Sequence, residues 1–296
     1  MISLSPDKDM LGQAELAVIL VSLLVGFTAR WLILKVDYRQ YPTYPNAYLI
    51  HLTTGFIAAA IGAVAVPALL SRNFTAVTFL TLAIQQFRDV RKAERDALQN
   101  LESSENSGRG KAYIDGIAKT LEGRNYMAMI SSFLTSTVAS IQFSTLPVRT
   151  LVGAVTGCLA FLLLRLFTKG KQISDIATLR QGKLSFDGAS LYVDDIFVMN
   201  VGSSKVQHRI MADGLGIILE PNDENAALVL GNIGQRQAME HEVSRLMGLE
   251  RYIASHRNFS DGRVALAFVP VRQEPASTLQ VLGQVPVLEA VKKIIK

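Results

Sequence analysis

The sequence predicts an α-helical polytopic membrane bundle of about five transmembrane helices, followed by a small cytoplasmic α+β domain. The mean hydropathy of the 296-residue chain is +0.27, whereas soluble domains usually have a negative value. Only 19% of the residues are charged, against about 25% in typical soluble proteins. The long apolar runs all lie before about residue 168, and residues 169–296 have the composition of an ordinary soluble domain.

We expect five membrane spans in the transmembrane domain, residues 1–168. Apolar runs place them at 14–36, 47–70, 74–87, 126–146 and 148–168. A span needs about 20 apolar residues, so 74–87 is short, and a re-entrant segment is the alternative for it. In the fifth span Gly153 and Gly157 form a GxxxG pattern, which predicts close helix packing.

The distribution of Lys and Arg predicts the orientation. Eight of these cations lie between residues 88 and 124, which identifies 88–125 as a cytoplasmic loop. The N-terminus is then outside and the C-terminal domain, residues 169–296, is cytoplasmic. Of the net charge of +5, +4 falls before residue 169, where basic flanks of membrane spans explain it. We therefore expect the lipid bilayer, and no nucleic acid, as a partner.

An amphipathic helix is predicted just before the fourth span, where Tyr113, Ile114, Ile117 and Leu121 share one stripe. From the residues alone this is an interfacial helix that leads into the span. Gly116 interrupts the helical pattern at a cost of about 1 kcal/mol relative to Ala, which predicts close packing of this segment. The packing partner is expected to be a span or the soluble domain.

The same stretch carries a resemblance. The hexapeptide Tyr113-Ile114-Asp115-Gly116-Ile117-Ala118 resembles the signature of the YIEGIA family, integral membrane proteins of endospore-forming Firmicutes. Asp115 stands where that signature has Glu, which keeps the carboxylate and shortens its reach. The resemblance implies a bacterial cell-membrane protein linked to sporulation. It implies no activity and no catalytic residues.

Polar residues inside the spans have two interpretations. Ser132, Ser136, Ser140 and Ser144 repeat every four residues, as in a stripe that lines a path for water or ions. Hydroxyls at this spacing also pack helices together, and the absence of a carboxylate beside them favours packing. The ionisable candidates are Arg30, His51 and Arg165. We expect both arginines to snorkel at the cytoplasmic face and His51 to lie at headgroup depth.

The soluble domain is expected to mix strands with helices. Strand-like stretches are 191–201, 216–220, 226–230, 264–269 and 278–282, and helix-like stretches are 235–247 and 287–295. This order predicts a small α+β domain, and about 125 residues are enough for a core of its own.

No complete catalytic or metal-binding motif is present in the sequence. His241-Glu242 begins like the zinc motif HExxH, but Arg245 replaces the second histidine. Cys158 lies within an apolar run, away from any zinc pattern. We expect Asp194-Asp195 to be a solvent-facing edge or bulge rather than a metal site. We therefore expect no catalytic residue, no metal and no cofactor.

Two weaker chemical hypotheses stay open. Residues 231–234, Gly-Asn-Ile-Gly, precede a predicted helix, where backbone N–H groups can hold an anion, although a turn with a helix cap also explains them. The second is a hydrolytic pair formed by a serine and a histidine. Its candidates are Ser203 or Ser204 with His208, His241 or His256.

The function that these observations favour is that of a membrane anchor or adaptor in sporulation. It would recruit or regulate protein partners, or form a homo-oligomer, through the 88–125 loop and the C-terminal domain. The first alternative is a membrane-associated hydrolase or protease with a Ser/His site. The second is a transporter of small solutes or ions that uses the serine stripe.

Overall fold

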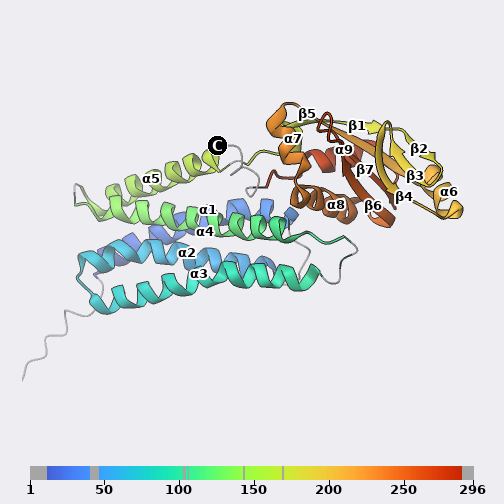
Figure 1. The fold of residues 1–296 in the computed structure, drawn as a ribbon. Coiled ribbons are helices and arrows are strands. Elements are labelled where there is room, and N and C mark those ends of the chain that lie inside the picture. Colours follow the sequence, from blue (N-terminus) through green and yellow to red (C-terminus); the bar gives the residue numbers. More distant parts are fainter. Residues whose placement is uncertain are drawn as a thin grey trace, which may run out of the picture. The chain divides into compact units, whose positions relative to one another are not determined.

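A computed structural model of the protein describes residues 12–40, 47–102, 105, 107–142, 144–168 and 170–288. The chain divides into two compact units. One consists of Met1–Glu94 with Ile117–Lys169, and the other of Arg95–Gly116 with Gly170–Lys296. The C-terminal end of α3 and the N-terminal end of α4, two of the long helices labelled in Figure 1, therefore belong to the same unit as the C-terminal residues.

The first unit is a helical bundle. Its helices are α1 (Gln13–Gln40), α2 (Ala47–Leu70), α3 (Phe74–Glu102), α4 (Lys111–Ser140) and α5 (Leu146–Phe167). A three-residue turn reverses the chain between α2 and α3, with Arg72 in the left-handed region at φ 52°. Asn73 then caps α3, because its side-chain oxygen accepts a hydrogen bond from the N–H of Ala76 at 2.9 Å.

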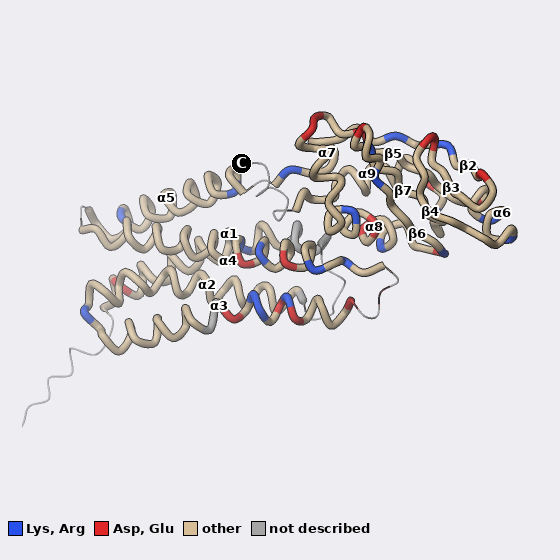
Figure 2. The backbone as a smooth tube through the Cα atoms, in the orientation of Figure 1, with Lys and Arg blue, Asp and Glu red and all other residues tan. Residues whose placement is uncertain are grey.

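Three of these helices are long and apolar enough to cross a membrane: Gln13–Leu34, Tyr48–Leu70 and Leu146–Phe167. They correspond to the expected spans 14–36, 47–70 and 148–168. The expected span 74–87 lies in α3, and residues 126–140 of the expected span 126–146 lie in α4. Both helices are long enough to cross a membrane, but neither contains a stretch that is apolar enough. The reason is local composition, since charged residues fill the second half of α3 and the first half of α4 (Figure 2).

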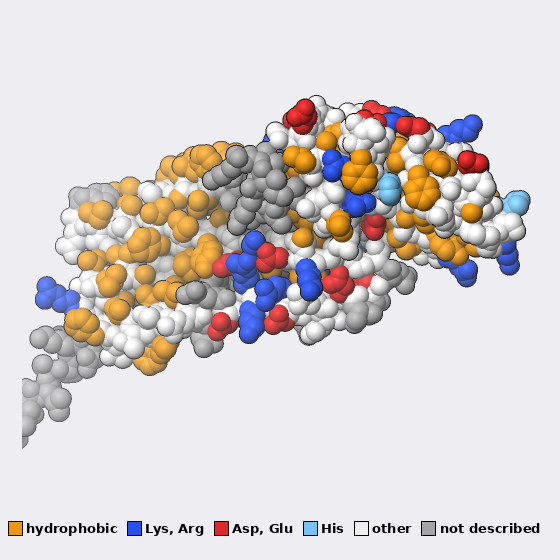
Figure 3. Space-filling view, in the orientation of Figure 1, with side chains coloured by type: hydrophobic (Ala, Val, Ile, Leu, Met, Phe, Trp, Pro, Cys, Tyr) orange, Lys and Arg blue, Asp and Glu red, His pale blue; other side chains and the backbone are white. Residues whose placement is uncertain are grey.

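The surface of the bundle is largely apolar. Figure 3 shows many hydrophobic side chains spread over the visible face of the bundle. Exposed hydrophobic side chains of the bundle include Leu24 62%, Leu69 60%, Phe79 67%, Leu163 56% and Phe167 86%. An apolar surface of this extent is typical of a membrane or protein contact. Together with the three apolar helices, it indicates association with a membrane.

The second unit stacks two antiparallel sheets and a layer of helices. Its elements after η1 (Ile173–Asp175) are β1 (Ala177–Gly182), β2 (Leu184–Asp187), β3 (Ser190–Val193), β4 (Ile196–Asn200), α6 (Ser204–Asp213), β5 (Leu215–Pro221), α7 (Glu224–Gly231), α8 (Ile233–Met247), β6 (Leu249–Arg257), β7 (Val264–Pro270) and α9 (Pro275–Gly283). One sheet has the strand order β1-β5-β7-β6 and the other the order β2-β3-β4. The C-terminal region is therefore of mixed α and β structure.

The core of this unit lies between the two sheets and under the helices. Val193 and Ile196 of the small sheet share one buried cluster with Ile218 of β5. Side chains alternate along a strand, so the neighbours of Ile218, Ile217 and Leu219, are buried on the opposite face of the large sheet. The helices α7, α8 and α9 pack against the strands of this sheet.

Three expected strands differ from the structure: one is a pair of strands and two are helices. The expected strand 191–201 is the hairpin of β3 and β4, and the expected strands 226–230 and 278–282 are helices α7 and α9. A capping residue explains α7, because Asp223 accepts a hydrogen bond from the N–H of Ala226 at 2.6 Å. The expected strands 216–220 and 264–269 and the helix 235–247 are confirmed by β5, β7 and α8. Of the expected helix 287–295, Val287 and Leu288 are not helical, and the rest lies outside the described residues.

Candidate functional site

The signature hexapeptide lies near the start of α4. Tyr113, Ile114, Ile117 and Ala118 are buried, with exposed fractions of 2, 0, 4 and 1%, and Leu121 is exposed by 4%. This confirms the expected apolar stripe. Asp115 and Gly116 are half-buried. A methyl group added at Gly116 would meet only the Leu288 side chain, at an ordinary contact distance of 3.7 Å, so the packing there is less close than expected.

Within the second unit, the first signature residue contacts α8. The hydroxyl of Tyr113 donates a hydrogen bond of 2.7 Å to Oε1 of Glu242, and both side chains are buried. The other carboxylate oxygen of Glu242 accepts a hydrogen bond of 2.7 Å from Arg245. Burial, followed by the charge of Glu242, raises the pKa of Tyr113 well above its usual value, so the phenol stays protonated and remains a donor.

The connection between α3 and α4 adds further buried charges beside Tyr113. His241 of α8 is exposed by only 3%, and its Nδ1 lies 2.8 Å from the carbonyl oxygen of Ser107 and 3.0 Å from Oε2 of Glu105. Arg109, exposed by 1%, pairs with Glu105 at 2.7 Å. We call Glu105, Ser107, Arg109, Tyr113, His241, Glu242 and Arg245 together the signature cluster.

Glycine and a helix-capping carboxylate shape this connection. The N–H of Gly110 donates a hydrogen bond of 2.6 Å to Oε1 of Glu102, the last residue of α3. Gly110 has a φ of 78°, a conformation that residues with a Cβ rarely adopt. The chain can therefore reverse between α3 and α4 and bring Tyr113 onto α8.

A second set of buried polar side chains lies within the bundle. Arg30 of α1 is fully buried, and its Nε donates a hydrogen bond of 2.8 Å to Asn125 of α4. His51 of α2 lies 3.8 Å from the carboxylate of Glu94 in α3. The expectation that Arg30 snorkels is therefore wrong for the bundle as it is packed, since helix neighbours bury its side chain. His51 is buried as well, and its expected depth at the headgroups stays a prediction. Arg165 is exposed on α5.

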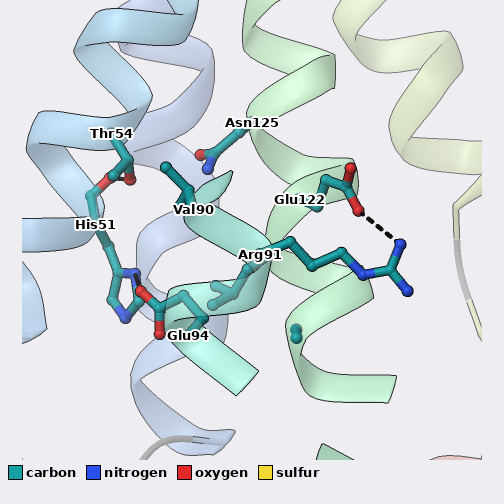
Figure 4. A pocket seen from close by; sticks show the side chains of 9 residues that line it. His51, Thr54, Val90, Arg91, Glu94, Glu122 and Asn125 are labelled. Atoms are coloured by element: carbon teal, nitrogen blue, oxygen red, sulfur yellow. Dashed lines mark hydrogen bonds and ion pairs between the residues drawn. The ribbon is translucent and has the colours of Figure 1, made fainter. Parts of the chain in front are cut away.

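Figure 4 shows the small pocket around these side chains. It is lined from three helices by His51, Thr54, Val90, Arg91, Glu94, Ala118, Leu121, Glu122 and Asn125. Across it Arg91 pairs with Glu122 at 3.3 Å. Arg30 with Asn125 thus links α1 to α4, while contacts with α3 come from α2 through His51 and from α4 through Glu122.

Of the four serines in the stripe, Ser132 and Ser136 pack against neighbouring helices and Ser144 is exposed. The hydroxyl of Ser132 lies 2.8 Å from the carbonyl oxygen of Ser22 and 2.7 Å from that of Ala59, and Ser136 donates to the carbonyl of Ala63 at 2.9 Å. Both serines are fully buried. Ser140 is the last residue of α4, and Ser144 is exposed before α5. The two buried hydroxyls thus hold α4 against α1 and α2.

The two glycines of the fifth span face α4. A Cβ at Gly153 would lie 2.7 Å from the carbonyl oxygen of Thr135, and a Cβ at Gly157 would lie 2.8 Å from that of Ser131. Both positions are buried although most of α5 is exposed. Only glycine permits this close approach of the two backbones.

The remaining chemical candidates are not assembled into sites. Nδ1 of His208 bonds the carbonyl of Ser204 rather than its hydroxyl, His256 makes an edge-to-face ring contact with Phe197, and His241 lies in the signature cluster. In the described part of the chain, therefore, no serine hydroxyl is hydrogen-bonded to any of these histidines. The described residues also contain no group of three or more His, Cys, Asp or Glu side chains placed to hold a metal ion.

The acidic pair and the Gly-Asn-Ile-Gly segment have local structural roles. Asp194 and Asp195 form the turn between β3 and β4, with Asp194 at φ 53°. Their carboxylates pair with Arg180 and Arg263, each at 2.6 Å. Asn232 caps α8 by accepting a hydrogen bond of 3.2 Å from the N–H of Gln235. Helix capping thus accounts for residues 231–234.

The partners of the signature residues were not recognised in the sequence. Glu105 and Arg109 carried no pattern that set them apart from other charged residues. Glu242 was noted only as part of an incomplete HExxH motif, and it lies 129 positions from Tyr113. The one usable signal was the tyrosine at the start of an otherwise apolar stripe, because a buried phenol requires a hydrogen-bond partner. Asn125 likewise carried no sign that it would accept from Arg30.

The fold and this site define a helical protein of membrane type that carries an α+β unit. Comparison with known proteins identifies the family. The model of the YIEGIA protein family matches residues 18–296, and the chain belongs to this family. A protein of Bacillus subtilis (strain 168), described as uncharacterized protein YphB, is 40% identical over 278 residues, which cover 92% of each chain. No solved structure matches the chain.

Proposed function

We propose that this protein is a five-span anchor of the bacterial cell membrane that acts in sporulation as an adaptor for protein partners. Its N-terminus would be outside and its C-terminal unit in the cytoplasm. The observation that carries the adaptor role is that the second unit contains Arg95–Gly116 in addition to the C-terminal residues. The C-terminal residues are therefore connected to the bundle by three chain segments, at α3, α4 and α5.

Such a connection suits a domain that is presented to partners. Within the second unit, Tyr113 contacts Glu242 and Ser107 contacts His241, so the start of α4 and the connection before it are held on α8. We infer that the connection between α3 and α4 together with the C-terminal unit forms the surface that recruits or regulates partners.

The five-span topology is supported by connectivity. Only three residues separate α2 from α3, and five separate α4 from α5, so α3 starts and α4 ends beside the ends of apolar spans. At 1.5 Å per residue, helices of 29 and 30 residues are about 45 Å long, more than the roughly 30 Å of a bilayer core. Phe74 and Phe79 of α3 are exposed by 79 and 67%, as expected for contact with lipid.

Cysteine labelling tests this topology. Cys158 is first replaced by Ala, and Gln99→Cys then places a thiol on the exposed face of α3. With five spans, a membrane-impermeant maleimide labels this thiol only after permeabilisation. Ser144→Cys is the matched control, since its position between α4 and α5 is labelled from outside. Labelling of Gln99→Cys in intact cells would contradict the five-span proposal.

Affinity purification tests the adaptor role. The tagged full-length protein is solubilised in detergent from membranes of sporulating cells and compared with a variant that lacks residues 170–296. We expect a stoichiometric partner protein that is lost with the deletion. Absence of any partner, under conditions that preserve a known membrane complex, would contradict the proposal. Among the described residues, no candidate serine hydroxyl is hydrogen-bonded to a candidate histidine, as the hydrolase alternative requires. The buried hydroxyls of Ser132 and Ser136 bond backbone carbonyls of α2 rather than line a path for solutes, as the transporter alternative requires.

A further inference from the structure

The histidine of the signature cluster is held in one tautomer. A carbonyl oxygen can only accept a hydrogen bond, so the contact with Ser107 assigns the ring hydrogen of His241 to Nδ1. The other ring nitrogen, Nε2, is buried, and no described group is hydrogen-bonded to it. The docked connection between α3 and α4 therefore fits a neutral imidazole.

We propose that the signature cluster is a pH-sensitive latch. Neutral His241 holds the connection between α3 and α4 on α8, and protonation of its Nε2 weakens this contact. The inference goes beyond the adaptor function and does not depend on it, because it concerns only the contacts of Glu105, Ser107, Arg109 and Tyr113 with α8. It assigns His241 as the residue that responds and the proton as its ligand.

The charged groups around His241 agree with a contact that weakens when the ring is protonated. From the connection, Arg109 repels a protonated ring and Glu105 attracts it, but Glu105 is already paired with Arg109 at 2.7 Å. From α4, Tyr113 faces the ring as a neutral phenol, with a centroid separation of 6.3 Å. From α8 itself, Glu242 attracts the ring but is engaged by Tyr113 and Arg245.

Protonation would thus bury a second N–H without an acceptor. That arrangement costs more than the same protonation in water. In agreement with the geometry, burial is the largest influence on His241 and lowers its pKa, and Arg109 acts in the same direction. Glu105 and the Ser107 carbonyl oppose the change.

The sign of the pH dependence follows from linkage. A released histidine has a pKa of about 6.5, and the docked one has a lower value, so the released state binds more protons as the pH falls. The docking contribution is complete above about pH 7 and declines below about pH 6.5. Between about pH 7.5 and 5.5 a single proton can weaken docking by at most about tenfold.

Hydrogen exchange of the full-length protein in detergent tests the latch. The reporters are the amides of Tyr113 and Ile114, which both donate to the carbonyl of Gly110 at 3.1 Å. After correction for the intrinsic pH dependence of exchange, we expect their protection to fall by up to about tenfold from about pH 7.5 to 5.5. Constant protection in the wild-type protein would overturn the proposal without any variant.

Two variants identify the responding residue. His241→Gln keeps a side-chain donor but cannot titrate here, so its protection is expected to be independent of pH within about twofold. His208→Gln is the matched control, because His208 is exposed on α6 and its replacement leaves the wild-type dependence intact. A fall in His241→Gln equal to that of the wild type would overturn the assignment.

Discussion

Removal of the Tyr113 hydroxyl tests how firmly the signature segment is bound to α8. In Tyr113→Phe the ring and its burial are kept, and the 2.7 Å hydrogen bond to Glu242 is lost. A hydrogen bond to a charged partner contributes about 1.5–3 kcal/mol. Glu242 keeps its bond to Arg245, so we expect a loss in the lower half of this range, about 2 kcal/mol.

A loss of this size is measurable as local opening. About 2 kcal/mol corresponds to roughly a thirtyfold change in an equilibrium constant. We expect the amides of 111–116 to exchange about thirtyfold faster in Tyr113→Phe than in the wild type at neutral pH, with the bundle unchanged. Hydrogen exchange followed by mass spectrometry measures both regions in one experiment.

A control and a cycle make this result specific. Tyr126→Phe removes a longer bond of 3.2 Å to Glu122, four residues away in the same helix, and is expected to leave exchange at 111–116 unchanged. In a double-mutant cycle, Glu242→Gln and Tyr113→Phe are expected to be non-additive, because they alter one interaction. Exchange in Tyr113→Phe within twofold of the wild type, or strict additivity, would refute the reasoning.

Three further predictions concern packing. Gly26→Ala places a methyl group 2.7 Å from the Ala128 carbonyl oxygen and should destabilise the detergent-solubilised protein by about 1–3 kcal/mol. At Gly123 an added methyl group meets nothing within 4 Å, so Gly123→Ala should stabilise the protein by up to about 1 kcal/mol. Ser132→Val should cost about 1 kcal/mol and Ser144→Ala nothing; equal melting temperatures would contradict the packing role. Gln235→Ala removes the bonds to Pro286 and Leu288, so proteolysis should release the C-terminal segment faster than in the wild type.

The sequence predicted the bundle better than it predicted the polar contacts within it. Arg30 read as a snorkelling residue because it ends an apolar run, yet it is fully buried and bonded to Asn125. The partner comes from a helix 95 positions away, and no local pattern encodes such a pairing. For the same reason, the sequence did not predict Glu242 as the hydrogen-bond partner of Tyr113.

Short apolar stretches were the other source of error. The stretches 226–230 and 278–282 are helices, since an apolar run of five residues fits a strand and a buried helical turn equally well. Asp223 and Pro275, which stand at the two helix starts, were the available signals.

Composition and periodicity alone determined that an apolar helical region precedes a mixed α and β region, and that Tyr113 to Leu121 presents a buried stripe. These properties are local, because burial of a helix face is written into every third or fourth residue. The tertiary structure decided which polar groups meet: Tyr113 with Glu242, Arg30 with Asn125, and Ser132 with two neighbouring backbones. It also decided that Arg95–Gly116 folds with the C-terminal residues. Such pairings depend on long-range packing, which brings distant residues within hydrogen-bond distance and excludes water from them.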